Sequence, residues 1–322
     1  MVFRRMPCQP SVVFDKSSGA RVREGGDCVL QSGVPIRTRR EAYICLNAGE
    51  FWCYEGNNRS KWRVPVNDIE PRFGFGRNWL RYSKTIDEAA LAASTEGVER
   101  LLCGLSLKGK SFLDIGCGSG LHAIAANRLG AASIDAFDYD ANSVKATIAN
   151  FARFAPNARA NVSQADILNH QGQRKYDVVY SWGVLHHTGD MWRAIGNASE
   201  LVEKDGLFII AIYKKTTFCE TWKKIKRLYA GGGPVIRFAL AAGFLTPLFI
   251  GKILARQKIV RGMSWYYDAI DWLGGYPYES ASADEIISFV EGAEFAKILT
   301  ANTEFSRGLF GSGCAEYVFR KI

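Results

Sequence analysis

The chain has 322 residues, 48% of them hydrophobic and 23% charged, which excludes a largely disordered protein. Its eight cysteines are scattered, with neither a CxxC pair nor a histidine cluster at metal-ligand spacing, so the sequence predicts no zinc or other metal site. The net charge of +9 comes from residues 214–261, where eleven lysines or arginines stand against the single acid Glu220, and the rest of the chain is close to neutral.

Residues 1–70 carry glycine and polar clusters, and only short runs such as 42–46 and 50–54 are typical of strands. We interpret them as an irregular N-terminal extension of unknown role. The first residues are polar and are broken by Pro10, unlike a secretory signal, so we expect a cytoplasmic protein with reduced thiols.

Apolar spacing predicts one helix over 78–105, followed by alternating strands and helices. Strands are predicted at 111–115, 133–137, 161–165, 176–180, 207–213, 296–300 and 314–320, and helices at 121–129, 142–154, 191–202 and 282–290. This alternation predicts an α/β fold with a doubly wound, seven-stranded, mostly parallel sheet. Residues 71–215 and 281–322 form the predicted core. Residues 216–280 form a helical insertion or lid after the fifth strand, over the sheet edge where such folds bind ligands.

A glycine-rich loop follows the first predicted strand, in the sequence Phe112-Leu-Asp-Ile-Gly-Cys-Gly-Ser-Gly120. Gly116, Gly118 and Gly120 permit a tight turn, a close approach of backbone to ligand and close packing of the next helix. A dinucleotide site requires GxGxxG and a pyrophosphate, whereas here Asp114 stands two residues before the first glycine. A carboxylate at this place suits a cationic ligand and would repel a pyrophosphate.

This loop resembles motif I of the class I S-adenosylmethionine-dependent methyltransferases. The resemblance implies a Rossmann-like methyltransferase fold with S-adenosylmethionine as cofactor, and it places Asp114, Gly116 and Gly118 at the amino acid moiety. Further stretches of the chain are similar to a bacterial small-molecule group of this family that carries Gly-Val-Leu-His-His, here residues 183–187. These stretches are 73–79, 137–144, 181–192, 274–279 and 313–319.

Two more acids, Asp138 and Asp166, stand at the ends of the next two strands. Asp138 is placed to accept both ribose hydroxyls. Asp140 could compete for this role, but it stands directly before a helix and is the better N-cap. The resemblance assigns Asp166 to the adenine amino group, with Tyr139 and Ile167 beside the ring. Taken singly, each acid could instead be a solvated loop carboxylate.

The loop after the fourth strand is where the resemblance places the methyl group and its acceptor. His186 or His187 is a candidate base, with His186 preferred, and the alternative is that one of the pair only orders the loop by hydrogen bonding. Ser181 and Trp182 are expected to line the cofactor through backbone and ring. The loop lacks the Asn/Asp-Pro-Pro-Tyr/Phe and Pro-Cys or Thr-Cys sequences of enzymes that methylate base amines, glutamine amides or cytosine C5.

Within the insertion, the sequence predicts a basic amphipathic helix over 219–229. It also predicts an apolar hairpin over 238–250, which is too short to span a membrane and is broken by Pro247. The predicted helix has Trp222, Ile225, Leu228 and Tyr229 on one face and Lys223, Lys224, Lys226 and Arg227 on the other. Residues 214–261 have two interpretations. They could form a lid that rests on the inner face of an anionic membrane and admits a lipid-like acceptor. Alternatively, they form a lid or a homodimer contact whose basic rim is solvated. A nucleic acid is not the expected partner, although RNA stays a third alternative.

Aromatic segments flank both predicted sites. Tyr266, Tyr276 and Tyr278 suit a wall over the acceptor, with an ordinary packed turn as the alternative. Residues 73–79 are expected to close over the cofactor, unless Trp79 is core. The sequence predicts methyl transfer to a small or lipid-like acceptor, at oxygen, with His186 assisting deprotonation. The alternatives are C- or N-methylation of a metabolite and a cofactor-binding RNA-associated protein.

Overall fold

The computed structural model describes residues 72–170, 172, 174–255, 265–302 and 313–322, together with the backbone of five strands nearer the N-terminus. Of 247–255 and 265–268 it describes the backbone alone. The chain divides into two compact units, Met1–Arg72 and Phe73–Ile322.

The Met1–Arg72 unit contains two small antiparallel sheets. One pairs β1 (Ala20–Val22) with β2 (Cys28–Leu30), and the other pairs β3 (Ala42–Asn47), β4 (Glu50–Glu55) and β5 (Asn58–Val64) in chain order. The two strand-like runs of the sequence correspond to β3 and β4. The sequence did not predict β1, β2 or β5, and β5 completes a three-stranded meander with β3 and β4.

The Phe73–Ile322 unit is built on a seven-stranded sheet with the order β11-β12-β10-β9-β6-β7-β8. Its strands are β6 (Ser111–Ile115), β7 (Ser133–Asp138), β8 (Ala160–Gln164), β9 (Tyr176–Trp182), β10 (Val202–Tyr213), β11 (Phe295–Ala301) and β12 (Cys314–Lys321). Strand β12 runs opposite to the other six strands, so its pairings with β10 and β11 are antiparallel and the other pairings of the sheet are parallel. The predicted doubly wound, seven-stranded, mostly parallel sheet is confirmed.

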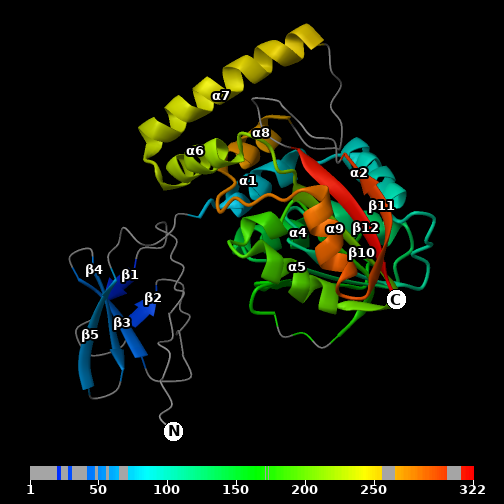
Figure 1. Cartoon of the computed structure of the whole chain (residues 1–322), viewed down its shortest axis with the longest axis horizontal. Coiled ribbons are helices and arrows are strands. Elements are labelled where there is room, and N and C mark those ends of the chain that lie inside the picture. Colours follow the sequence, from blue (N-terminus) through cyan, green and yellow to red (C-terminus); the bar gives the residue numbers. More distant parts are fainter. Residues whose placement is uncertain are drawn as a thin grey trace. The chain divides into compact units, whose positions relative to one another are not determined.

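The helices of this unit are α1 (Phe75–Tyr82), α2 (Glu88–Leu101), α3 (Leu121–Arg128), α4 (Ala141–Phe154), α5 (Met191–Glu200), α6 (Cys219–Gly231), α7 (Pro234–Ala255), α8 (Trp265–Gly274) and α9 (Ala283–Glu291). Helices cover both faces of the sheet, among them α2 and α3 on one face and α5 and α9 on the other (Figure 1). Successive strand residues belong to different cores because side chains alternate across a strand. Phe112 packs in the core with α2 and α3, whereas Leu113 packs in the core with α5 and α9.

Two boundaries differ from the sequence prediction. The single helix expected over 78–105 is two helices, because the Asp87 carboxylate accepts the Ala90 N–H and starts α2 afresh. Strand β10 begins at Val202 rather than 207, and its pairing with β9 shifts register between Val202 and Leu207, where Asp205 has a φ of 61°.

The insertion after β10 consists of α6, α7 and α8, which gather at one end of the Phe73–Ile322 unit (Figure 1). The predicted apolar hairpin is wrong: α7 is one helix of 22 residues that continues through Pro247. None of the described helices combines the length and apolarity needed to cross a membrane.

Candidate active site

The glycine loop leaves β6 at the carboxyl edge of the sheet. Gly116 has a φ of 76°, and its N–H donates to the carbonyl oxygen of Phe137 at 2.8 Å, which joins the loop to the end of β7. A Cβ at Gly116 would lie 2.4 Å from Val184, and one at Gly120 would lie 2.7 Å from Thr147 on α4. The loop is thus wedged between the segment after β9 and helix α4, and these positions admit glycine alone.

Two carboxylates lie side by side under this loop. Asp114 is 2% exposed, and its Oδ2 has no hydrogen-bond partner among the described residues. Burial, and then the charge of Asp138, raise the pKa of Asp114 to about 7. Asp138 accepts the N–H groups of Gly118 at 3.0 Å and Asp140 at 2.8 Å, and burial raises its pKa to about 6. Such a pair, with one oxygen atom unsatisfied, favours a cationic ligand.

Asp140 is the N-cap of α4, as predicted, because it accepts the Asn142 N–H at 2.8 Å. Its second oxygen accepts the Gly76 N–H at 3.0 Å, which fixes α1 against the start of α4. The Trp79 ring on α1 comes within 3.1 Å of the place where a Cβ of Gly118 would lie. The segment 73–79 therefore covers the glycine loop through Trp79.

The residues predicted to bind adenine lie after β7 and β8 but differ in exposure. Tyr139 is 44% exposed, whereas Ile167 is 4% exposed and packs in the core with Phe137. Asp166 accepts the Leu168 N–H and the Asn169 side-chain amide, both at 3.0 Å, so its carboxylate also closes its own turn. The proposed contacts with adenine stay predictions.

Ser181 and Trp182 end strand β9 beside the glycine loop. The buried Ser181 hydroxyl donates to the Ile115 carbonyl at 3.0 Å and ties β9 to β6. The Trp182 indole N–H donates to Glu316 at 3.0 Å, and Glu316, only 2% exposed, also pairs with Arg100 at 2.8 Å. Sequence reasoning missed Glu316, although an acid inside the apolar run 314–319 was a signal of a buried polar contact.

His186 is fully buried in a short 3₁₀ turn, Leu185–His187, that follows β9. Its Nδ1 accepts the Tyr213 N–H at 3.4 Å. Because a neutral imidazole has a single acceptor nitrogen, Nε2 then carries the proton. Nε2 has no hydrogen-bond partner among the described residues. Burial, and then the charges of His187 and Lys226, hold the pKa of His186 well below its usual value.

His187 has the opposite tautomer. Its ring centroid lies 4.4 Å from that of His186, and its Nδ1 lies 2.7 Å from the carbonyl oxygen of Pro277. A carbonyl oxygen only accepts, so Nδ1 donates, and when the ring is neutral its lone pair lies on Nε2. The ring is half-buried, 5.1 Å from Phe75, and a Cβ at Gly275 would come within 2.6 Å of it.

Of the three tyrosines predicted to line the acceptor, the structure describes the side chains of Tyr276 and Tyr278. Tyr276 and Tyr278 are each 2% exposed, and the Tyr278 hydroxyl donates to the sulfur of Cys219 at 3.3 Å. The Tyr276 carbonyl accepts the Phe73 N–H at 3.0 Å, so the loop after α8 is joined to the segment before α1. Tyr266 lies in α8, but its side chain lies outside the described residues.

Lys226 corrects the predicted amphipathic helix. It was placed on the solvent face of α6, yet it is fully buried while Leu228 is 52% exposed. Its ammonium donates to the Trp272 carbonyl and lies 3.8 Å from the Trp272 ring centroid and 5.0 Å from that of Tyr278. No described acid forms an ion pair with it, and burial holds its pKa well below the usual value.

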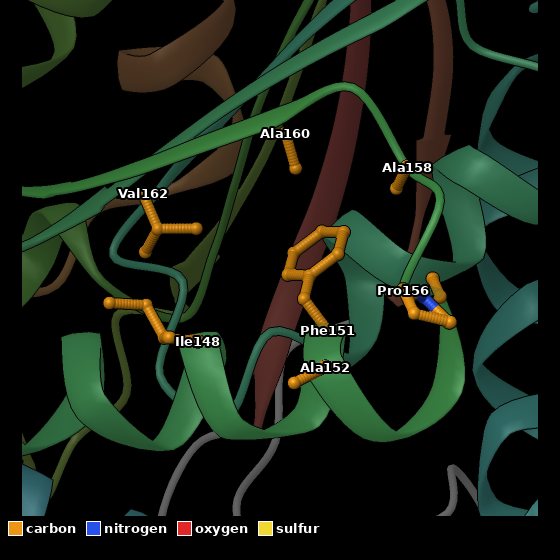
Figure 2. Close-up of a pocket in the computed structure, with 8 residues that line it drawn as sticks. Ile148, Phe151, Ala152, Pro156, Ala158, Ala160 and Val162 are labelled. Carbon is orange, nitrogen blue, oxygen red and sulfur yellow. The ribbon is translucent and has the colours of Figure 1, made fainter.

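A separate apolar pocket of about 230 Å³ lies between α4 and β8 (Figure 2). Phe151 points from α4 toward Ala160, and Ile148 and Val162 complete one end. No titratable side chain lines this pocket, so it is not a site of chemistry. Within the described part of the chain, no group of three or more His, Cys, Asp or Glu side chains is placed to hold a metal ion.

Comparisons with known proteins agree with this geometry. The family model described as "Methyltransferase domain" matches residues 86–302. A ubiquinone biosynthesis O-methyltransferase of Pelagibacter ubique is 27% identical over 158 residues, which are 48% of this chain and 61% of that protein. A ribosomal protein L11 methyltransferase of an Enterobacter species is 38% identical over 76 residues, which are 21% of this chain and 26% of that protein. The chain thus matches less than two thirds of either relative.

A solved structure of the magnesium protoporphyrin IX methyltransferase of Synechocystis, with bound S-adenosylhomocysteine, aligns with 72% of this chain and 83% of that protein. The sequence identity is 16% and the TM-score is 0.46.

Proposed function

Because the chain belongs to the methyltransferase domain family and its cofactor is S-adenosylmethionine, we propose that it transfers the methyl group to a hydroxyl oxygen of a small or lipid-like acceptor. Within the family we place it in the small-molecule group that carries the sequence of residues 183–187. When bound, the cofactor would supply a methyl group on a sulfonium: the acceptor oxygen would form a bond to the methyl carbon as the bond from that carbon to sulfur breaks, and S-adenosylhomocysteine would leave as a neutral thioether. The protein has to align the acceptor and remove its proton.

The residues at the carboxyl edge fit a cationic cofactor. Asp114 has a buried, unsatisfied oxygen and a raised pKa, both of which an ammonium group would relieve. We assign Asp114, Gly116 and Gly118 to the amino acid moiety and Asp138 to the ribose. Tyr139, as an exposed ring after β7, would cover the adenine.

The observation that carries the proposal is the hydrogen bond from His187 Nδ1 to the Pro277 carbonyl. It leaves the lone pair on Nε2, the form that a general base requires, and it holds the ring in one orientation. His186 has the reverse arrangement, because it accepts the Tyr213 N–H. We therefore assign the base to His187 and give His186 a role in ordering the loop, in place of the sequence-based preference for His186.

The acceptor would lie between the histidine turn, the end of β10 and the insertion. Phe75 from α1 and Tyr213 from β10 lie 5.1 and 5.3 Å from the His187 ring, so its surroundings are aromatic. Aromatic walls suit a flat or apolar acceptor with a single reacting hydroxyl. A lipid-like acceptor would come from a membrane surface, and the basic residues 214–261 would favour contact with an anionic one.

The test uses S-adenosylmethionine carrying ¹³C in its methyl group, mixed with lipid and aqueous extracts of cells that contain the protein. The carbon chemical shift of the product separates methyl groups on oxygen, nitrogen and carbon. We expect an oxygen-bound methyl group in one extract. A nitrogen- or carbon-bound methyl group overturns the assignment to oxygen, and label in neither extract with intact cofactor binding points to the non-enzymatic alternative.

The same product then distinguishes the histidines. His187→Gln is expected to lower kcat by about 10²- to 10⁴-fold, the usual contribution of a general base. His186→Gln, the matched control in the same turn, is expected to change kcat by less than about tenfold. Equal losses, or a loss confined to His186→Gln, contradict the assignment.

A further inference from the structure

Helix α7 is apolar on two opposite faces, which is unusual for a helix at the surface. One face packs inward, where Leu240 and Phe244 contact the cluster of Trp222 and Leu273. The other face is open: Val235 is 81% exposed and Phe238 is 76% exposed.

This exposed face continues onto α6. Leu228, near the end of α6, is 52% exposed. We call Leu228, Val235 and Phe238 the α6–α7 apolar face. Figure 1 shows α7 on the outer side of α6 and α8, and no other described element of the Phe73–Ile322 unit lies beyond it. Three large exposed apolar side chains within eleven residues mark an interaction site rather than scattered exposure.

Basic side chains predominate on α6 beside this face, although the Glu279 carboxylate lies within electrostatic reach of Lys223. Lys223, Lys224 and Arg227 are exposed on α6, within two turns of Leu228. Glu220 is the only acid from 214 to 261. Arg237 donates instead to the last carbonyl groups of α6, those of Tyr229 and Ala230, and so fixes the turn between the two helices.

We propose that the α6–α7 apolar face docks on an anionic lipid bilayer. Leu228, Val235 and Phe238 enter the boundary between head groups and acyl chains, while Lys223, Lys224 and Arg227 contact anionic head groups. A bilayer is the partner that matches both features at once. A second copy of the chain would bring two sets of basic side chains together, and a nucleic acid would leave the apolar side chains without a partner.

The arrangement also relates the bilayer to the acceptor site. The base of α6 contacts the loop after α8 through Cys219 and Tyr278, and that loop holds His187 through Pro277. A membrane contact on the outer side of the insertion therefore lies over the elements that form the proposed acceptor site. This last step rests on the proposed function, whereas the docking itself does not.

The test is sedimentation of the full-length protein with phosphatidylcholine vesicles that do or do not contain phosphatidylserine. We expect binding to the anionic vesicles that weakens with salt, and a weaker affinity for the neutral ones. The double variant Val235→Ser/Phe238→Ser should lose binding at least about tenfold. Lys223→Glu/Lys224→Glu should also weaken it, since each basic residue near an anionic surface contributes about fivefold.

The control is Ile148→Ser, which removes an apolar side chain that is 51% exposed on α4, outside the insertion. It should bind vesicles as the wild type does, and all variants should bind S-adenosylmethionine unchanged, which separates this proposal from methyl transfer. Equal binding to both vesicle types, no binding, or no effect of Val235→Ser/Phe238→Ser overturns the proposal. So does a dimer that the same variant dissociates, or binding to RNA alone.

Discussion

Replacing Asp114 with asparagine should stabilise the cofactor-free protein and weaken cofactor binding at the same time. The carboxylate is 2% exposed and one of its oxygens has no hydrogen-bond partner among the described residues. Its ionised form is therefore costly in the folded state. An asparagine of the same shape removes that charge, but it also removes the anion that a cationic cofactor would meet.

The size of the effect follows from the pKa. Folding raises the pKa of Asp114 from 3.8 to about 7. A difference of about 3 units corresponds to about 4 kcal/mol at most, since each unit is worth about 1.36 kcal/mol. In this range Asp114 binds more protons in the folded protein than in the unfolded one, so its contribution to stability is most favourable below about pH 4 and is lost as the pH rises through about 7.

Urea unfolding of both proteins without cofactor, at about pH 4 and about pH 8, measures this difference. We expect Asp114→Asn to be more stable than the wild type by about 1–4 kcal/mol at the higher pH and nearly equal at the lower one. Asp135→Asn, which alters an acid earlier on β7 that pairs with Arg174, is the control and should show no such gain. A variant that is less stable than the wild type at both pH values would refute the reasoning.

Calorimetric titration measures the second expected effect, the weaker binding of the cofactor. Loss of a hydrogen bond to a charged group costs about 1.5–3 kcal/mol, so Asp114→Asn should bind S-adenosylmethionine about 10- to 150-fold more weakly. Wild-type affinity in the variant would contradict the role given to Asp114.

Two more variants test the packing of the site. Lys226→Met should gain thermal stability relative to the wild type as the pH is lowered from about 9 to 6. The reason is that burial lowers the pKa of Lys226, so the wild type loses stability as the pH falls. A difference in Tm that does not depend on pH would mean that the amine does not titrate in this range. Gly116→Ala should unfold more easily than Gly109→Ala. Both glycines have a positive φ, which costs an alanine about 1–2 kcal/mol, but only at Gly116 would the new Cβ collide with Val184. Equal losses of stability in urea unfolding would show that the collision is relieved.

The sheet and its glycine loop could be predicted because their signals are local. The strand before Asp114, the glycines after it and Asp140 directly before a helix each determine structure within a few residues. The helix N-cap at Asp140 is confirmed for this reason.

The position of Lys226 could not be predicted in this way. The buried residues of α6 include Trp222, Lys226 and Tyr229, and a lysine is normally assigned to solvent. What holds it is the carbonyl of Trp272, 46 residues away in the chain. The histidine tautomers depend likewise on distant partners, since Tyr213 lies 27 residues from His186 and Pro277 lies 90 residues from His187.

The assignment of the base is tested most directly by ¹⁵N NMR of the imidazole rings near neutral pH. The rings of His186 and His187 are distinguished by comparison with the two glutamine variants, and this needs no knowledge of the acceptor. The account predicts a proton on Nε2 of His186 and on Nδ1 of His187, with His186 remaining neutral to well below the usual pKa of histidine. A proton on Nε2 of His187, with its lone pair on Nδ1, would contradict it.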